Sequence, residues 1–265
     1  MKTRAITGFF FVVALVCATI FNEYVFSIFF GIVGILAAKE FFTICKTEET
    51  KPLEGLGLVT SIVLATIAIA YFLGYIELKY FGLAIPLFSL LFISSLYLKR
   101  AKPFHDIAYT ILGIWYGTIP FLFFIGLGFI NGDFNPYIPM GFLIILWSND
   151  TGAYLSGRAL GRTKLFERIS PNKTWEGFIG GVLLAMGVAF GLSYWFGTLT
   201  KLEWVMIAAI IGIFGTLGDL VESMLKRSLG IKDSGSILPG HGGFLDRFDG
   251  LLIAAPLVYI LLTLF

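Results

Sequence analysis

The chain has 265 residues, a mean hydropathy of +0.89 and only 14% charged residues, against about 25% in ordinary soluble domains. This composition excludes a water-soluble globular enzyme and indicates an integral membrane protein, in which nothing outside the apolar segments is long enough to form a separate soluble domain. The formal net charge of +2 identifies no class of partner, because the placement of charge in a membrane protein matters more than its sum.

Apolar segments of about 20 residues, the length that a membrane-spanning helix needs, recur along the whole chain. We expect an all-α protein with nine spans, at residues 5–22, 24–45, 57–76, 80–98, 106–130, 137–157, 174–197, 202–225 and 245–265. The first segment starts like a signal peptide but lacks a convincing small-x-small cleavage site, so we interpret it as a span. We expect five spans in residues 1–130 and four, carrying the candidate site, in residues 131–265 of one membrane-embedded unit.

Lysine and arginine gather in alternate loops, and this asymmetry predicts the orientation of the chain. With the N-terminus in the cytoplasm, the inner side holds Lys2, Arg4, Lys46, Lys51, Lys99, Arg100, Lys102, Arg158, Arg162, Lys164, Arg168, Lys173, Lys226, Arg227, Lys232 and Arg247. Only Lys79 and Lys201 fall outside, and Lys39 lies within the second span. The C-terminus is then outside, and a water-soluble substrate would reach the protein from the cytoplasm.

The second predicted span carries an acidic residue near its inner end, where acidic side chains are costly and indicate function. This residue, Glu40, follows Lys39 directly. From the sequence alone, Glu40 either reaches the same cavity as the other polar residues or forms a local ion pair with Lys39.

The sixth predicted span ends in the polar sequence "WSNDTGAYLSGRALG". It places Asn149 and Asp150 within an apolar helix. The small residues Gly152, Ser156 and Gly157 follow, and they predict a close approach to a neighbouring helix.

The sequence "SPNKTWEG", residues 170–177, leads into the seventh predicted span and is typical of a capped helix start. Lys173 lies close to that helix N-terminus, where backbone N–H groups attract negative charge. We therefore expect an anion site at Lys173.

The eighth predicted span ends in "GTLGDLVESMLKR", which puts Asp219, Glu222, Ser223 and Lys226 on one helix face by the i, i+3, i+4, i+7 rule. An acidic residue near a helix C-terminus opposes the helix dipole, so Asp219 is not there as a cap. It is either a metal ligand or a structural partner of Lys226 or Arg227.

The polar stretch "KDSGSILPGHGGFLDRFDG", residues 232–250, separates the last two predicted spans. Its glycines allow backbone N–H groups to crowd around phosphate oxygens, or they form a flexible turn. Asp246 and Asp249 follow as an i, i+3 pair at the start of the ninth span. With Asp219 they bring carboxylates from two helices to matching depth, and hard oxygen ligands suit Mg²⁺. Acids at a helix start also favour the dipole, which is the alternative for this pair.

The stretch "SMLKRSLGIKDSGSILPGHGGFLDRFD", residues 223–249, resembles the signature of the phosphatidate cytidylyltransferase (CDP-diacylglycerol synthase) family. The matching positions are Ser223, Lys226, Arg227, Lys232, Asp233, Gly235, Leu238, Pro239, His241, Gly242, Gly243, Asp246, Arg247 and Asp249. The "WSNDTGAY" and "PNKTWEG" segments are also similar to the family. The resemblance says little about residues before about 140.

This resemblance implies a reaction in which CTP and phosphatidate give CDP-diacylglycerol and pyrophosphate with Mg²⁺, with K⁺ as a candidate second cation. It implies a homodimer, a location in the cell inner (cytoplasmic) membrane and an active site that faces the cytoplasm. We expect Asp219 and Asp246 to bind the metal, with Asp249 or else Asp233 beside them, and Lys226 to share in catalysis. The substrate-binding residues that we expect are Asn149, Asp150, Lys173, Ser223, Arg227, Lys232, Asp233, His241, Gly242, Gly243 and Arg247.

Three other functions compete with this interpretation. A CDP-alcohol phosphotransferase would need a D-G-x2-A-R run, but Asp249 and Gly250 are followed by "LLIAAP". A polyprenol or dolichol kinase also uses CTP at a membrane, and only its acceptor lipid separates it from the favoured reaction. An ion-coupled transporter would carry charges near the midplane and two repeated halves, and we find no repeat.

Overall fold

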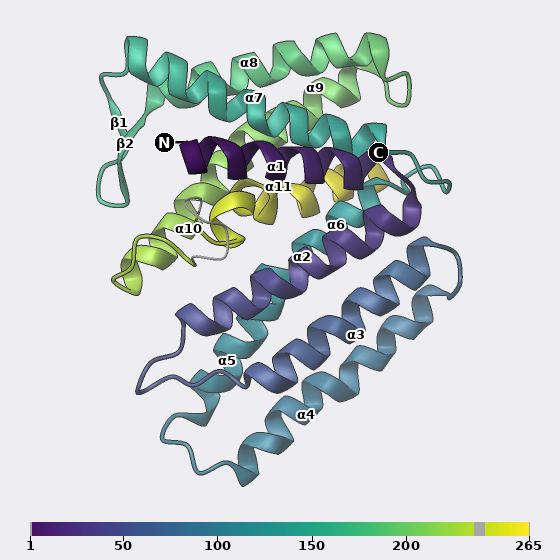
Figure 1. Ribbon diagram of the computed structural model, residues 1–265, viewed down its shortest axis with the longest axis vertical. Coiled ribbons are helices and arrows are strands. Elements are labelled where there is room, and N and C mark those ends of the chain that lie inside the picture. The colour runs from purple at the N-terminus through teal and green to yellow at the C-terminus, as the bar shows by residue number, and fades with distance from the viewer. Residues whose placement is uncertain (1, 236–241, 265) are drawn as a thin grey trace. The chain divides into compact units, whose positions relative to one another are not determined.

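The computed structural model describes residues 2–235 and 242–264, and most of them are helical (Figure 1). The helices are α1 (Lys2–Ile20), α2 (Glu23–Ile44), α3 (Glu54–Phe72), α4 (Ala84–Tyr97), α5 (Pro103–Gly113), α6 (Ile119–Leu127), α7 (Tyr137–Leu160), α8 (Trp175–Trp195), α9 (Lys201–Ile210), α10 (Thr216–Ser228) and α11 (Leu245–Leu264). A 3₁₀ turn, η1 (Leu78–Leu83), leads into α4, and two π turns, η2 (Ile114–Thr118) and η3 (Ile211–Gly215), join α5 to α6 and α9 to α10. A hairpin of β1 (Lys164–Phe166) and β2 (Ser170–Thr174) is an element that the sequence analysis does not predict.

Within the described residues, seven helical segments are long and apolar enough to cross a membrane. They are Glu23–Ile44, Glu54–Phe72, Leu78–Tyr97, Pro103–Leu127, Trp175–Trp195, Lys201–Ser228 and Leu245–Leu264. Each overlaps one predicted span, which confirms a helical multi-pass membrane protein. The remaining two predicted spans coincide with α1 and α7. That these two cross the membrane, and the orientation of the chain, stay predictions.

Large apolar side chains cover the outer faces of these helices. Ile85 is 68% exposed, Leu96 81% and Leu183 63%. A soluble protein rarely exposes apolar surface on this scale, whereas lipid tails are as apolar as leucine. These faces are therefore suited to a lipid environment.

The chain divides into two compact units, each built from two stretches of sequence. The first unit comprises the described parts of Met1–Ile125 and Asp233–Arg247, and the second comprises Gly126–Lys232 and the described part of Phe248–Phe265. The described residues of 233–247 therefore pack with the N-terminal helices.

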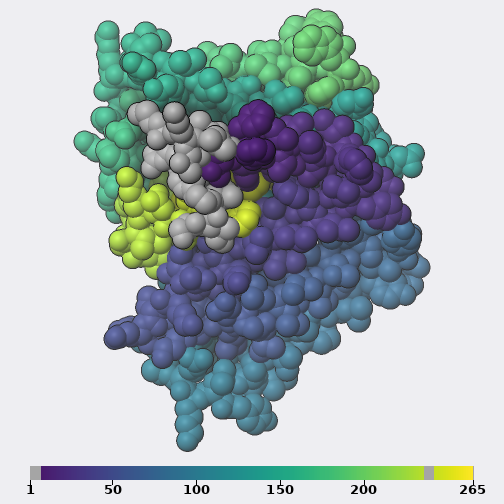
Figure 2. All heavy atoms as spheres, in the orientation of Figure 1, coloured from purple at the N-terminus to yellow at the C-terminus, as the bar shows by residue number. Residues whose placement is uncertain are grey.

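In the first unit, α2 packs against α1, α3, α5 and η2, and α3 packs against α4 (Figure 1). On the face shown in Figure 2, the purple atoms of the N-terminal helices border the blue atoms of the helices that follow them. The ring of Phe124 lies 4.6 Å from that of Phe30 and 6.0 Å from that of Phe26, measured between centroids. Gly117 of η2 allows a close approach, since a Cβ there would lie 2.5 Å from the backbone nitrogen of Ala38. This packing fixes the end of α2 that carries Glu40.

In the second unit, α7 and α8 run side by side, and the β1–β2 hairpin joins them (Figure 1). A Cβ added to Gly180 would lie 2.1 Å from the Ser156 hydroxyl oxygen, and one added to Gly152 would lie 2.9 Å from the Cβ of Leu184. The close helix approach predicted from Gly152 and Ser156 is confirmed. It brings the hairpin and α8 beside the polar end of α7.

A glycine-to-alanine pair tests this packing in the second unit. At Gly141 an added Cβ would lie 2.3 Å from the indole ring of Trp204, which is fully buried, so Gly141→Ala should lower the free energy of unfolding by about 1–3 kcal/mol. Gly187 has open space around it, and Gly187→Ala is the matched control. The measurement is thermal unfolding in detergent. Equal melting temperatures for the two variants would contradict the packing.

Candidate active site

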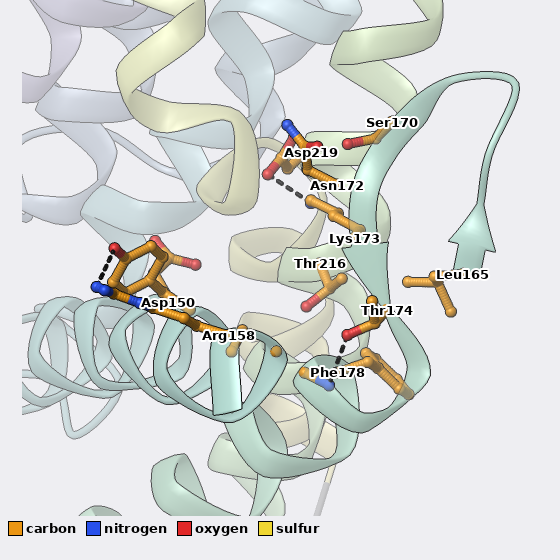
Figure 3. Close-up of a pocket in the computed structure, with 14 residues that line it drawn as sticks. Asp150, Arg158, Leu165, Ser170, Asn172, Lys173, Thr174, Phe178, Thr216 and Asp219 are labelled. Atoms are coloured by element: carbon orange, nitrogen blue, oxygen red, sulfur yellow. Dashed lines mark hydrogen bonds and ion pairs between the residues drawn. The ribbon is translucent and has the colours of Figure 1, made fainter. Parts of the chain in front are cut away.

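A cavity of about 580 Å³ lies in the second unit, where α7, the hairpin, α8 and α10 meet (Figure 3). Its lining residues are Asp150, Ala153, Tyr154, Gly157, Arg158, Leu165, Ser170, Asn172, Lys173, Thr174, Gly177, Phe178, Thr216 and Asp219. The volume falls within the range of about 300–1,000 Å³ typical of small-molecule sites.

An ion pair between β2 and α10 lies in this cavity. The Lys173 Nζ atom is 2.5 Å from Oδ2 of Asp219, as the dashed line in Figure 3 shows. The Ser223 hydroxyl, one turn further along α10, donates a hydrogen bond of 3.3 Å to Oδ1 of Asp219. Both oxygens of the Asp219 carboxylate therefore have a partner. Asp219 therefore forms its ion pair with Lys173 of β2. The sequence alternative expected this pair with Lys226 or Arg227 of α10.

Further carboxylates surround Asp219 within the second unit. Asp249 is repelled electrostatically by Asp219, Asp150 and Glu222, and Asp150 is repelled by Asp219 while Lys173 attracts it. Like charges so close together in a membrane protein are costly unless cations neutralise them. Carboxylate oxygens are also the ligands that Mg²⁺ prefers. These donors are therefore of the chemical kind that binds a divalent cation.

The hairpin is what carries Lys173 to the cavity. β1 and β2 pair antiparallel, with Lys164 opposite Thr174, and the Thr174 hydroxyl then accepts the Gly177 N–H at 3.2 Å as the N-cap of α8. The Glu176 carboxylate accepts backbone N–H groups from the residues before β1, Arg162 and Thr163. The cap predicted from "SPNKTWEG" is confirmed, and it ties both ends of the hairpin to α8.

Asn149 lies behind the cavity wall. Its side chain is buried, and its Nδ2 donates to the Thr216 hydroxyl at 3.4 Å, while that hydroxyl donates to the carbonyl of Gly212 in η3 at 2.9 Å. Thr216 and Asp150 line the cavity and Asn149 does not. Asn149 thus supports the wall, and its predicted contact with substrate stays a prediction.

The basic residues of α10 point to different partners. Lys226 forms an ion pair with Glu222, one turn before it and almost fully buried. Arg227 is exposed and donates to the carbonyl of Ile231 at 3.2 Å, which closes the end of α10. Lys232 is exposed. The predicted polar face of α10 is confirmed by the contacts of Ser223 with Asp219 and of Lys226 with Glu222.

The first unit contains the other half of the predicted signature. Oδ2 of Asp246 accepts hydrogen bonds of 2.9 Å from the Ser234 and Gly243 backbones, and the Ser234 hydroxyl also lies 2.9 Å from it. Gly242 has a φ of 78°, and a Cβ there would lie 2.4 Å from Oδ2 of Asp246. Glu40 accepts from the Ser234 hydroxyl and from the Phe244 and Leu245 backbones. Glu40 therefore contacts the signature segment, and its bonds go to that segment instead of to Lys39.

The predicted site residues are distributed over both units. The second unit brings Asp150, Lys173, Asp219 and Ser223 together. In the first unit Asp233 and Arg247 are exposed. His241 lies outside the described residues. Among the residues that are described, no three His, Cys, Asp or Glu side chains converge as a ready metal site, so the ligand set stays a prediction.

Several lining residues escaped the sequence analysis. Arg158 was assigned only to the positive inner loop, and Tyr154 lay unremarked inside the motif "WSNDTGAY". Their spacing could have predicted them, because Tyr154 and Arg158 lie four and eight residues after Asp150 and therefore on the same face of the helix. Ser170 and Asn172 depend on the unpredicted hairpin.

Comparison with known proteins gives a consistent result over the full length of the chain. Residues 2–265 match the cytidylyltransferase family. A phosphatidate cytidylyltransferase of Staphylococcus aureus (strain COL) is 36% identical over 271 residues, covering 99% of both chains. The protein of that name from Bacillus subtilis (strain 168) is 34% identical and covers 100% of this chain and 98% of its own. The protein of that name from Staphylococcus haemolyticus (strain JCSC1435) is 44% identical over 172 residues, 62% of each chain.

The cap at Thr174 can be tested by two substitutions of similar size. Thr174→Val removes the oxygen that accepts the Gly177 N–H and should cost about 1 kcal/mol of stability, as loss of an N-cap does. Thr174→Ser keeps the acceptor and should stay close to the wild type. Thermal unfolding in detergent measures both, and a serine variant as unstable as the valine variant would argue against the cap.

Proposed function

The chain belongs to the cytidylyltransferase family, and on that premise we propose that it transfers the CMP group of CTP to phosphatidate, with CDP-diacylglycerol and pyrophosphate as products. Two relatives that span the whole chain carry the name phosphatidate cytidylyltransferase. The observation that carries the proposal is the cavity in which Lys173 meets Asp219 and which Arg158 also lines. It offers cations for phosphates beside carboxylates for a metal ion.

The cavity is the proposed site for the triphosphate of CTP. Lys173 is accessible to a ligand, because its side chain is 26% exposed and the carboxylate with which it forms an ion pair, Asp219, is 37% exposed. Asp219 would be one of the residues that hold a cation, and Lys173 would then bind a phosphate oxygen. Arg158 adds a second positive charge, and its guanidinium suits bidentate contact with phosphate.

The proposed reaction is an in-line displacement at the α-phosphorus of CTP. A phosphate oxygen of phosphatidate forms the new P–O bond, and the bond to the departing pyrophosphate breaks. A phosphate monoester is already largely dianionic at neutral pH, so the attacking oxygen needs no general base. The protein contributes positioning and neutralisation of charge, which carry most phosphoryl transfers.

We propose Asp219 and Asp249 of the second unit as residues that hold Mg²⁺, with K⁺ as a second cation, and we propose Asp246 as a further ligand on the resemblance to the family alone. Their oxygen donors, and the mutual repulsion of Asp219 and Asp249, support this choice. When bound, Mg²⁺ neutralises charge that develops on the phosphate oxygens. Lys226, Arg227, Lys232 and Arg247 are the proposed phosphate-binding residues of α10 and of the segment that follows it.

The membrane setting completes the proposal. The phosphatidate head group lies at the bilayer surface and CTP is dissolved in the cytoplasm, so a site on the cytoplasmic side meets both substrates. The distribution of lysine and arginine supports that orientation, in the inner membrane. We also propose a homodimer, on the resemblance to the family.

The reaction is tested by release of pyrophosphate from purified protein in detergent with CTP, Mg²⁺ and K⁺. We expect release only when phosphatidate is present, together with a CDP-lipid product, and we expect a chelator to stop it until Mg²⁺ is returned. A polyprenol acceptor replaces phosphatidate in a parallel reaction. Turnover with the polyprenol alone would overturn the proposed acceptor.

Replacement of Asp219 tests the carboxylate at the centre of the cavity. Asp219→Asn keeps the size of the side chain but removes its charge, and we expect kcat to fall by at least about 10²–10³-fold, as for loss of one preorganised charged group. Asp133→Asn, a change of the same kind at an exposed loop residue of the second unit, is the control. Thermal unfolding establishes that both variants are folded. Wild-type turnover by folded Asp219→Asn enzyme would remove Asp219 from the site.

A further inference from the structure

Glu40 is an acidic residue of a membrane-spanning helix that is almost completely buried, with 4% of its surface exposed. Oε2 accepts the backbone N–H of Phe244 at 2.8 Å, and Oε1 accepts that of Leu245 at 3.1 Å. Oε1 also accepts from the Ser234 hydroxyl. All of these partners belong to the first unit and lie about two hundred residues further along the chain.

These bonds provide acceptors for the backbone N–H groups at the start of α11. A helix begins with N–H groups that have no partner inside the helix, and its N-terminus attracts negative charge. α11 begins at Leu245, and Glu40 reaches it from α2. Hydrogen bonds to a charged acceptor are among the stronger ones in proteins. A side chain from a different helix thus caps α11.

Ser234 connects this cap to Asp246. Its hydroxyl lies within hydrogen-bonding distance of both the Glu40 and the Asp246 carboxylates, and it has one proton, so it donates to one of them at a time. The Ser234 and Gly243 backbones donate to Oδ2 of Asp246 as well. Glu40 therefore holds the very residues that orient the Asp246 carboxylate.

The glycines next to Asp246 leave room for Glu40. A Cβ added to Gly243 would lie 2.0 Å from Oε1 of Glu40, and one added to Gly235 would lie 3.0 Å from Oε2. The sequence analysis interpreted these glycines as space for phosphate oxygens or as a flexible turn. At Gly243 the space is occupied by a carboxylate of the protein itself.

We infer that Glu40 is a positioning residue: it fixes Ser234 and residues 243–245 and thereby sets the orientation of the Asp246 carboxylate. The inference rests on the proposed function only in that Asp246 is taken as a ligand of Mg²⁺. Glu40 touches neither substrate nor metal in this role. Its effect passes through Ser234 and the start of α11.

The test uses the full-length enzyme and three substitutions. Glu40→Gln keeps the size of the side chain, but its amide nitrogen cannot accept an N–H, so one acceptor is lost. Glu40→Ala removes both acceptors. Glu23→Gln makes the same change at the other end of α2 and is the matched control. Two quantities are measured: hydrogen exchange of the amides of residues 243–246, and the Mg²⁺ concentration that gives half the maximal rate.

We expect the amides of residues 243–246 to exchange about tenfold faster in Glu40→Gln, as expected when a hydrogen bond to a charged group is lost, and faster still in Glu40→Ala. The Mg²⁺ concentration for half-maximal rate should rise about tenfold in Glu40→Gln. A residue that only fills space would leave the isosteric glutamine variant like the wild type in both measurements, and that result would overturn the inference.

The Gly243→Ala variant provides an independent check, because its added methyl group collides with Glu40. The double variant with Gly243→Ala and Glu40→Gln should exchange its amides little faster than either single variant, because both changes disrupt the same contact. If the double variant's increase in exchange rate equalled the product of the two single increases, the two changes would act independently and the inference would be contradicted. Should the wild-type enzyme prove indifferent to Mg²⁺, the proposed metal site fails, and the exchange measurements alone then decide the role of Glu40.

Discussion

A carboxylate in an apolar membrane protein must have a cation or several hydrogen-bond donors, because its burial is otherwise too costly. Each of the two units contains one carboxylate that is paired in this way, half-buried in the second unit and almost fully buried in the first. Asp219 lies 2.5 Å from Lys173, which links α10 to the strand that precedes α8. Glu40 is matched by two backbone N–H groups and one hydroxyl, which link α2 to the start of α11. In each unit, one acidic side chain thus bonds to a segment that is distant in the sequence and holds the two segments together.

The ion pair in the cavity also bears on the chemistry of the family. Without a ligand, Lys173 neutralises part of a group of carboxylates that repel one another. Under the proposed function, a substrate that carries phosphates, together with a divalent cation, would offer Asp219 and Lys173 each a new partner of the right sign. The charges of the proposed site would then be balanced with and without substrate, which is the kind of preorganisation that favours phosphoryl transfer.

Much of the fold follows from the sequence because lipid imposes a simple rule, which is about 20 apolar residues for each crossing. The same helical periodicity predicted the polar face of α10, where Ser223 contacts Asp219 and Lys226 contacts Glu222. The hairpin was missed because strands of three and five residues are too short to show an alternating pattern. The partners of Glu40 were missed for another reason. They lie about two hundred residues away, and a local pattern offers only its neighbour Lys39 as a partner.

The composition of the first unit from Met1–Ile125 and Asp233–Arg247 has a consequence for biosynthesis. The ribosome delivers α2 early, but the donors that satisfy Glu40 emerge only when nearly the whole chain has been made. Until then a glutamate sits near the end of an inserted helix without the groups that it bonds in the finished protein. Domains usually fold as units, from the N-terminus onward during synthesis. The described residues of 233–247 are made after the N-terminal helices, so their contacts with those helices can form only when most of the chain has been synthesised, and a fragment that stops at residue 125 lacks a part of its own unit.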